Sequence, residues 1–191
     1  MRPDGTTDEA YSLTARRLHW WTVAFLAIIV PVGLVMDGDT IKWSEATGNR
    51  LYDIHKLLGF SVLWLVLARL AYRVRHGAPA DEPTLAPWQK TVSHLTHWGI
   101  YGLLVLVPLL GWTATQMYPA VVLFGTFSLP SFVGVNQPLS ERIFGLHKLL
   151  AFGLIALIGM HIGAALFHYI IRKDGVLNRM WTALPRRDGR E

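Results

Sequence analysis

ERIFGLHKLLAFGLIALIGMHIGAALFHYIIRK, residues 141–173, is the stretch that decides the fold. It is long and apolar enough to cross a membrane as a helix, yet it carries His147 and His161. At 100° and about 1.5 Å per residue, their 14-residue spacing brings the two side chains within roughly 40° of one helix face and separates them by about 21 Å. One helix face therefore offers an imidazole near each side of the roughly 30 Å hydrocarbon layer. Ionisable residues inside a membrane span are functional by default, so this pair indicates a site.

The composition of the whole chain supports a membrane protein. Of 191 residues, 52% are hydrophobic and only 16% are charged, which is too apolar for an ordinary soluble domain. Four apolar segments, each near the length that a membrane helix needs, lie at residues 18–36, 55–75, 96–117 and 147–171. No small-residue cleavage site follows the first segment, so we expect a retained span and not a secretory signal. The sequence predicts an all-α fold, a bundle of four transmembrane helices.

The positive charges predict the orientation of this bundle. Lys and Arg are concentrated in the N-terminal arm, in the 72–95 linker and in the C-terminal tail, and this bias predicts that both termini are cytoplasmic. Because these residues flank apolar spans, we expect the bilayer as a partner and no nucleic acid. The long apolar connection at 118–146 is expected to cover the outer end of the bundle as a lid. Residues 176–191 are expected to form a short basic cytoplasmic tail.

The absence of cysteine restricts the cofactors. A chain without cysteine cannot bind Cys-ligated iron–sulfur clusters or form the thioether links of c-type haem. Depth then sorts the histidines, because His19 begins its helix at the inner side while His55 and His147 begin theirs at the outer side, and His161 lies about 21 Å deeper than His147. The four histidines therefore form two pairs, each at one depth in the membrane: His55 with His147 at the outer side, and His19 with His161 at the inner side. Two opposed imidazoles in an apolar four-helix cavity suit a six-coordinate, non-covalent haem b, whereas zinc needs three or four clustered ligands.

The remaining histidines leave one alternative open. His94 and His97 begin the third span at the inner side and could replace His19 as the inner ligand, although we expect them to support the ligands or a quinone site instead. Their spacing could also suit a di-iron bundle, but the spans contain no glutamates for one. His168 lies near basic residues and is expected to snorkel at the membrane interface. His76 is expected to be exposed in the linker.

Two arginines are candidate partners for haem propionates. Arg69 lies inside the apolar pattern of the second span, and Arg16 precedes His19 by one turn, together with Arg17. Arginine neutralises carboxylates by bidentate pairing, so Arg16 and Arg69 are predicted to contact the inner haem. The alternative for each is ordinary anchoring at the cytoplasmic interface.

The chain resembles the bacterial cytochrome b561 family of short four-helix di-haem membrane cytochromes. The resemblance covers nearly the whole chain and rests on the segments YSLTARRLHWW (11–21), YDIHKLLGF (52–60), SHLTHWGIYGLLVLVPLLGW (93–112), FGTFSLP (124–130) and LHKLLAFGLIALIGMHIGAALFHYIIRKDGVLNRM (146–180). It implies a cytochrome b561 membrane domain over residues 1–175 in the bacterial inner membrane. It also implies two b haems with iron ligated by His19, His55, His147 and His161, and electron exchange with the quinone pool.

The resemblance leaves the enzymatic role open. Some family members look like superoxide oxidases, which take an electron from superoxide at the periplasmic face and give it to ubiquinone, and others serve separate redox proteins. Four cations near the outer haem could attract superoxide, although nearby acidic residues offset them: Arg50, Lys56, Arg142 and Lys148. The alternatives are a haem-bearing relay subunit for a separate redox enzyme and, outside redox chemistry, a transporter with a histidine proton relay. The sequence assigns no catalytic residue and no oligomeric state.

Overall fold

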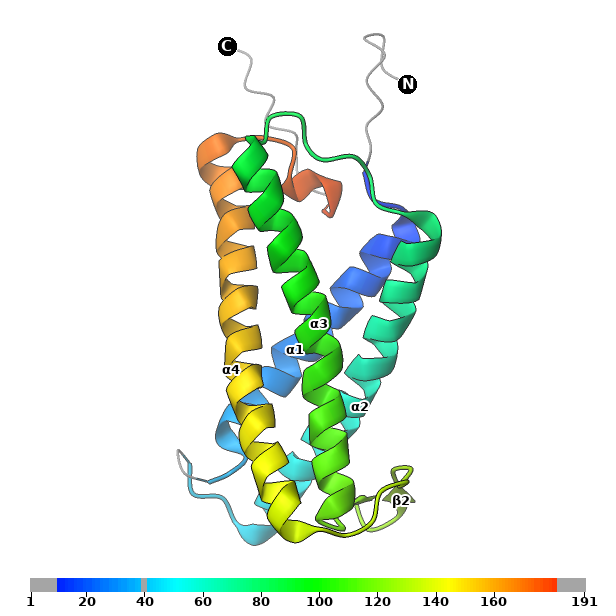
Figure 1. Ribbon diagram of the computed structural model, residues 1–191. Coiled ribbons are helices and arrows are strands. Elements are labelled where there is room, and N and C mark those ends of the chain that lie inside the picture. Colours follow the sequence, from blue (N-terminus) through cyan, green and yellow to red (C-terminus); the bar gives the residue numbers. More distant parts are fainter. Residues whose placement is uncertain (1–9, 39–40, 182–191) are drawn as a thin grey trace.

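The computed structural model describes residues 10–38 and 41–181. Four long helices make up the fold: α1 (Leu13–Val35), α2 (Glu45–His76), α3 (Pro87–Met117) and α4 (Gln137–Phe167). Each is long and apolar enough to cross a membrane. The predicted all-α bundle of four membrane helices is therefore confirmed. Figure 1 shows the helices running between two ends of an elongated bundle.

All four helices begin earlier than the apolar segments suggest, and a polar side chain caps the first turn of α1, α2 and α4 outside the apolar region. The Ser44 hydroxyl accepts from Thr47 N at 3.3 Å and so begins α2 ten residues before the predicted span. The Asn136 side chain accepts from Leu139 N at 3.2 Å and does the same for α4. Pro87 provides the first turn of α3, where its missing N–H costs no hydrogen bond.

The chain turns back on itself between successive helices, so the bundle has two chemically distinct ends. At one end, here called the hairpin end, strands β1 (Val122–Leu123) and β2 (Phe127–Ser128) form a small antiparallel hairpin between α3 and α4. At the other, here called the terminal end, the first and last described segments meet, with Tyr11 N donating to Arg179 O at 3.2 Å. The two described ends of the chain therefore lie at one end of the bundle.

The predicted lid at residues 118–146 is partly helical. Residues 137–146 belong to α4, and only the part before Asn136 is a connection. The hairpin in this connection is attached to α2, since Asp53 accepts from Phe124 N at 2.8 Å and Lys56 donates to Ala120 O at 3.1 Å. Leu123 is fully buried. The connection therefore does cover the hairpin end, as predicted.

The terminal end is closed by the last described residues. After α4 the chain makes a π-helical turn, η1 (His168–Arg172), and a 3-10 turn, η2 (Leu177–Arg179). The Trp20 indole donates to Met180 O at 3.1 Å and packs edge-on against Trp181 at 4.8 Å. The first six residues of the predicted tail thus lie against the start of α1. Residues 182–191 lie outside the described residues.

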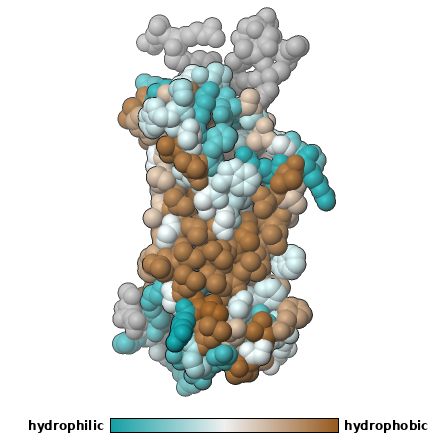
Figure 2. Space-filling view, viewed as in Figure 1, coloured by the Kyte–Doolittle hydropathy of each residue, from teal (hydrophilic) through white to brown (hydrophobic). Residues whose placement is uncertain are grey.

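The packing core is small and lies at mid-bundle, while the outside of the bundle is apolar. Val62, Val66, Tyr101, Leu104 and Leu154 form the buried cluster that joins α2, α3 and α4. Many large apolar side chains remain exposed along the helices. Figure 2 shows them as a continuous hydrophobic band with hydrophilic surface toward both ends, which is the pattern of a protein surrounded by lipid.

Candidate haem sites

The four predicted haem ligands lie in the two pairs that their sequence depths predict. His55 of α2 and His147 of α4 form the hairpin-end pair, with ring centres 6.2 Å apart and ring planes 82° apart. His19 of α1 and His161 of α4 form the terminal-end pair, at 6.4 Å and 78°. Each pair joins two different helices. The structure thus brings together the side chains that the depth argument paired.

The separation within each pair matches one bound metal ion. An imidazole nitrogen binds a transition metal at about 2 Å and lies roughly 1.2 Å from its ring centre, so two imidazoles on opposite sides of one iron have centres about 6.4 Å apart. The observed 6.2 Å and 6.4 Å are both within a few tenths of an ångström of that value. Each pair can therefore hold one iron with little movement of the rings.

Hydrogen bonding leaves the coordinating nitrogen of His147 free. Its Nδ1 lies 2.8 Å from Val107 O, so Nδ1 carries the proton and Nε2 presents its lone pair. The Nδ1 atoms of His19 and His55 are buried without a hydrogen-bond partner.

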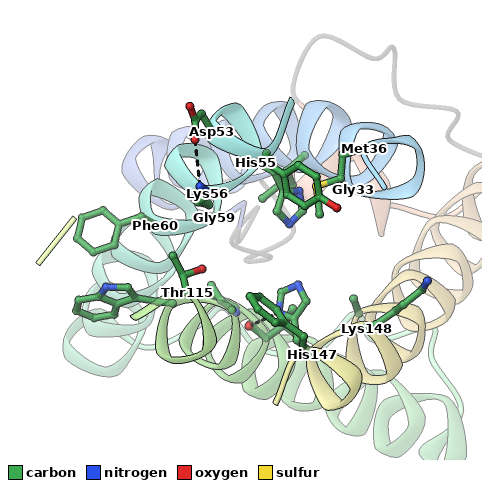
Figure 3. A pocket seen from close by; sticks show the side chains of 18 of the residues that line it. Gly33, Met36, Asp53, His55, Lys56, Gly59, Phe60, Thr115, His147 and Lys148 are labelled. Atoms are coloured by element: carbon green, nitrogen blue, oxygen red, sulfur yellow. Dashed lines mark hydrogen bonds and ion pairs between the residues drawn. The ribbon is translucent and has the colours of Figure 1, made fainter. Parts of the chain in front are cut away.

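The two histidines of the hairpin-end pair both line a cavity of about 1900 Å³. Figure 3 shows His55, next to Gly33, and His147, next to Lys148, on opposite walls of this cavity. Its interior is mostly apolar, and charged residues lie around the hairpin end of its lining: Asp37, Arg50, Asp53, Lys56, Glu141 and Lys148. Typical small-molecule sites occupy roughly 300–1,000 Å³, so the space suffices for a large planar cofactor.

The cations at the hairpin end are partly neutralised. Lys56 forms an ion pair with Asp53 at 3.0 Å. Lys148 of α4 forms an ion pair at 3.6 Å with Asp37, which lies at the end of α1. The sequence had suggested Asp53 as an offsetting charge, while the contact with Asp37 was missed because it joins helices far apart in the chain. The local excess of positive charge at this end is therefore smaller than a count of Lys and Arg suggests.

The terminal-end pair has a third histidine beside it. The His97 ring centre lies 5.1 Å from that of His161, which is closer than the spacing that one iron between two imidazoles requires. His19, at 6.4 Å, has the fitting separation. His94 instead reaches the 77–86 linker, where its Nε2 lies 3.1 Å from Asp81 Oδ1. The geometry thus favours His19 over His94 and His97 as the inner ligand.

One expectation for the remaining histidines is wrong. His168 does not snorkel at an exposed interface: it is 9% exposed, and its Nδ1 lies 2.6 Å from Asp174 Oδ2. The π-helical turn and the bend after it bring Asp174 back to the imidazole, and this fold-back has no signal in the apolar pattern. His76 is exposed as expected, and its ring stacks on Tyr72 at 4.1 Å.

Arg69 and Arg16 both lie near the terminal-end pair. The Arg69 guanidinium lies over the Tyr101 ring at 5.2 Å, and Arg73 lies over the same ring at 5.9 Å. No described carboxylate forms an ion pair with Arg69. The Arg16 Nε atom is buried without a hydrogen-bond partner. Both guanidiniums are therefore placed to receive an anionic group, and their contact with haem propionates remains a prediction.

Gly33 and Gly111 are site residues that the sequence reasoning missed. A side chain at either position would collide with an imidazole of the hairpin-end pair, Gly33 with His55 and Gly111 with His147. The sequence does contain a pattern that could have identified them, a spacing of 14 residues that recurs in all four helices. His19 and Gly33, His97 and Gly111, and His55 and Arg69 are each 14 residues apart, as are His147 and His161. Each of the four helices therefore has one of these residues at the depth of the hairpin-end pair and one at the depth of the terminal-end pair.

The chain is similar to known bacterial cytochromes over nearly its whole length. The chain is 32% identical over 177 residues to cytochrome b561 homolog 1 of Escherichia coli, covering 93% of this chain and 98% of that protein. It is 29% identical over 179 residues to the probable superoxide oxidase CybB of Yersinia pestis, covering 94% and 98%. The family described as prokaryotic cytochrome b561 matches residues 10–183. The chain therefore belongs to the prokaryotic cytochrome b561 family, whose members are multi-pass bacterial membrane proteins that bind b-type haem and transfer electrons.

Proposed function

We propose that this protein carries electrons across the bacterial inner membrane through two non-covalent b haems, one held by His55 and His147 and the other by His19 and His161. The observation that carries the proposal is the ring spacing of 6.2 Å and 6.4 Å in the two pairs. Haem iron supplies reversible one-electron chemistry when it is bound. Along α4 the two sites are roughly 21 Å apart, so together they extend over most of the apolar layer.

The orientation that we propose places the hairpin end in the periplasm. Basic residues of the terminal end support it, because cytoplasmic loops of membrane proteins are enriched in Lys and Arg. Those in the described part of the chain are Arg16, Arg17, Arg73, Arg75, Lys90, Arg172, Lys173 and Arg179. The hairpin-end pair is then the outer site and the terminal-end pair is the inner site.

Quinone is the redox partner that we propose in the membrane, and superoxide is the proposed electron donor at the periplasmic face. The similarity to a probable superoxide oxidase supports superoxide as the substrate. Two superoxide ions would each lose one electron to become dioxygen, and one ubiquinone would take up both electrons and two protons to become ubiquinol. Arg50, Lys56 and Lys148 line the outer cavity and would attract an anion, with the neutralisation described above.

A relay role for a separate redox protein is the second candidate. The exposed side chains on the hairpin loop support it, since Phe132 is 80% and Val135 69% exposed and both lie at the end where a periplasmic partner would dock. In this role the chain would exchange electrons with that partner and not with superoxide.

A purified sample tests these proposals. A reduced-minus-oxidised visible spectrum with haem extraction into acid acetone is expected to give two b haems per chain, since a chain without cysteine retains none covalently. A superoxide source is then expected to reduce added ubiquinone only in the presence of the protein. One haem per chain would contradict the di-haem proposal. Two haems without superoxide-dependent quinone reduction would reject superoxide as donor and leave the relay role.

A further inference from the structure

Two glycines lie directly against the imidazoles of the hairpin-end pair. A Cβ atom at Gly33 would lie 2.8 Å from His55 Cε1 and 3.2 Å from its Nδ1, and one at Gly111 would lie 3.0 Å and 3.1 Å from the same atoms of His147. Real Cβ atoms do not approach other heavy atoms at 2.8 Å. The two glycines belong to α1 and α3, while the histidines belong to α2 and α4. Each imidazole is thus held against a bare patch of a neighbouring helix.

The missing side chains also open a backbone carbonyl to each imidazole. In a helix, a side chain leans toward the N-terminus and covers the preceding turn, so a residue shields the carbonyl four positions earlier. The carbonyl four residues before Gly111 is that of Val107, and it accepts from His147 Nδ1 at 2.8 Å. The carbonyl four residues before Gly33 is that of Ile29, but His55 Nδ1 makes no hydrogen bond in this structure. The close contact between glycine and imidazole thus occurs twice, and at His147 it is accompanied by a hydrogen bond to the carbonyl.

The terminal-end pair lacks this arrangement. Among the described glycines, none would place a Cβ atom within 4 Å of His19 or His161. His161 has the His97 ring beside it instead. The two sites therefore share a histidine spacing and differ in what lies behind the histidines.

We infer that Gly33 and Gly111 are positioning residues of the outer haem site: they leave room for His55 and His147 to lie against α1 and α3, and Gly111 also leaves the Val107 carbonyl open to His147 Nδ1. This inference rests on the proposed binding of haem by the two histidine pairs. Donation from Nδ1–H to a carbonyl makes the other ring nitrogen a stronger ligand, which favours the oxidised iron. Gly111 thereby helps to give the outer haem a lower midpoint potential than it would have without this glycine.

The angle between the ring planes has a spectroscopic consequence. Each axial imidazole raises the energy of the iron d orbital with which its π system overlaps, so perpendicular rings act on two different orbitals and parallel rings act on the same one. With perpendicular rings the two orbitals stay close in energy, and oxidised low-spin iron gives a strongly anisotropic EPR signal. A methyl group that turns one ring reduces this anisotropy.

The test compares Gly33→Ala and Gly111→Ala with Gly102→Ala, a matched control in α3 whose Cβ would meet no atom within 4 Å. Haem content, EPR spectra and a redox titration are measured on the purified proteins, with His55→Ala used to assign the outer haem signals. For Gly33→Ala and for Gly111→Ala we expect a less anisotropic EPR signal of the outer haem and a raised midpoint potential of that haem, or selective loss of the outer haem. The inner haem and the control variant should match the wild type.

Unchanged outer signals in both variants, or equal perturbation of the two haems, would overturn the inference. Those results differ from failure of the proposed function itself. If the wild type does not contain two haems, the proposed haem sites are wrong. If it does contain them and the glycine variants behave like Gly102→Ala, only the positioning role is wrong.

Discussion

At the scale of single residues, the histidine pairs make the most direct prediction. His55→Ala and His147→Ala should each remove the same haem, because either change takes away one of two opposed ligands. His19→Ala and His161→Ala should each remove the other. Visible and EPR spectra of the four purified variants check the pairing. His94→Ala is the control, since His94 pairs with Asp81 near the surface, and it should retain both haems.

Loss of the inner haem in His94→Ala, with its retention in His19→Ala, would reverse the ligand assignment. The same spectra examine His97, whose ring lies 5.1 Å from His161. Because that spacing is too short for an iron between the two rings, His97→Ala should keep both haems and change only the inner signal.

Arg69 makes the second prediction at this scale. A guanidinium deep in an apolar span costs roughly 2.5–3.5 kcal/mol on insertion scales unless it is paired, and none of the described carboxylates pairs with Arg69. A haem propionate is the anion left at its level. Arg69→Leu should therefore lower the midpoint potential of the inner haem, by roughly tens of millivolts for about 1 kcal/mol of lost interaction. The outer potential should stay nearly constant in the same redox titration.

Arg75→Leu is the matched control, because Arg75 is on the same helix but exposed near its end. If the Arg69→Leu protein binds both haems and neither midpoint potential changes, Arg69 is only an anchor at the cytoplasmic interface.

These residues also show how far the sequence can be taken. The pairing of His55 with His147 followed from helix direction and rise alone, because membrane thickness converts sequence position into depth. The bond between His168 and Asp174 could not be predicted, since it depends on a turn beyond the apolar span. The glycines were missed because many glycines occur in membrane helices, and only the packing shows which ones face a ligand.

At the scale of elements, the hairpin depends on one carboxylate. Asp53 accepts from Phe124 N through one oxygen and from Lys56 through the other, and so ties α2 to the β1–β2 turn. Phe124 has φ +50°, a left-handed conformation that is unfavourable for a bulky residue without such support. Asp53→Ala should lower the free energy of unfolding by about 1 kcal/mol, because Phe124 N loses its acceptor and the partly buried Lys56 loses its ion pair.

Thermal unfolding in detergent and limited proteolysis of the 119–131 loop measure this effect. Glu45→Ala is the control, since Glu45 lies in the first turn of the same helix and is exposed. Equal stability and equal protease resistance of the two variants would show that the hairpin is held by Leu123 and its apolar contacts instead.

The helix boundaries show why element ends were harder to predict than element centres. Apolar periodicity locates the part of each helix inside lipid, but α2 and α4 extend about ten residues further through polar sequence. Their starts are set by Ser44 and Asn136, single capping residues whose effect is local. A search for caps upstream of each apolar segment would have located both helix starts.

At the scale of the whole molecule, the two ends must face different compartments. The hydrophobic band in Figure 2 fixes the bundle across the bilayer, and the four helices return the chain to the end at which it began. The direction depends on charge alone, because both ends carry polar surface. The excess of Lys and Arg at the terminal end predicts that this end is cytoplasmic.

The natural absence of cysteine gives a clean measurement of that direction. Ser131→Cys places one thiol on the hairpin end, and Ala78→Cys places one on the α2–α3 linker at the terminal end; both positions are exposed. A membrane-impermeant maleimide should label Ser131→Cys from the periplasmic side of spheroplasts, while Ala78→Cys should react only in inverted vesicles or after permeabilisation. The parent chain, without a thiol, controls for background. Labelling with the reverse pattern would place the His55 and His147 site at the cytoplasmic face, and superoxide from the periplasm would then be rejected as its substrate.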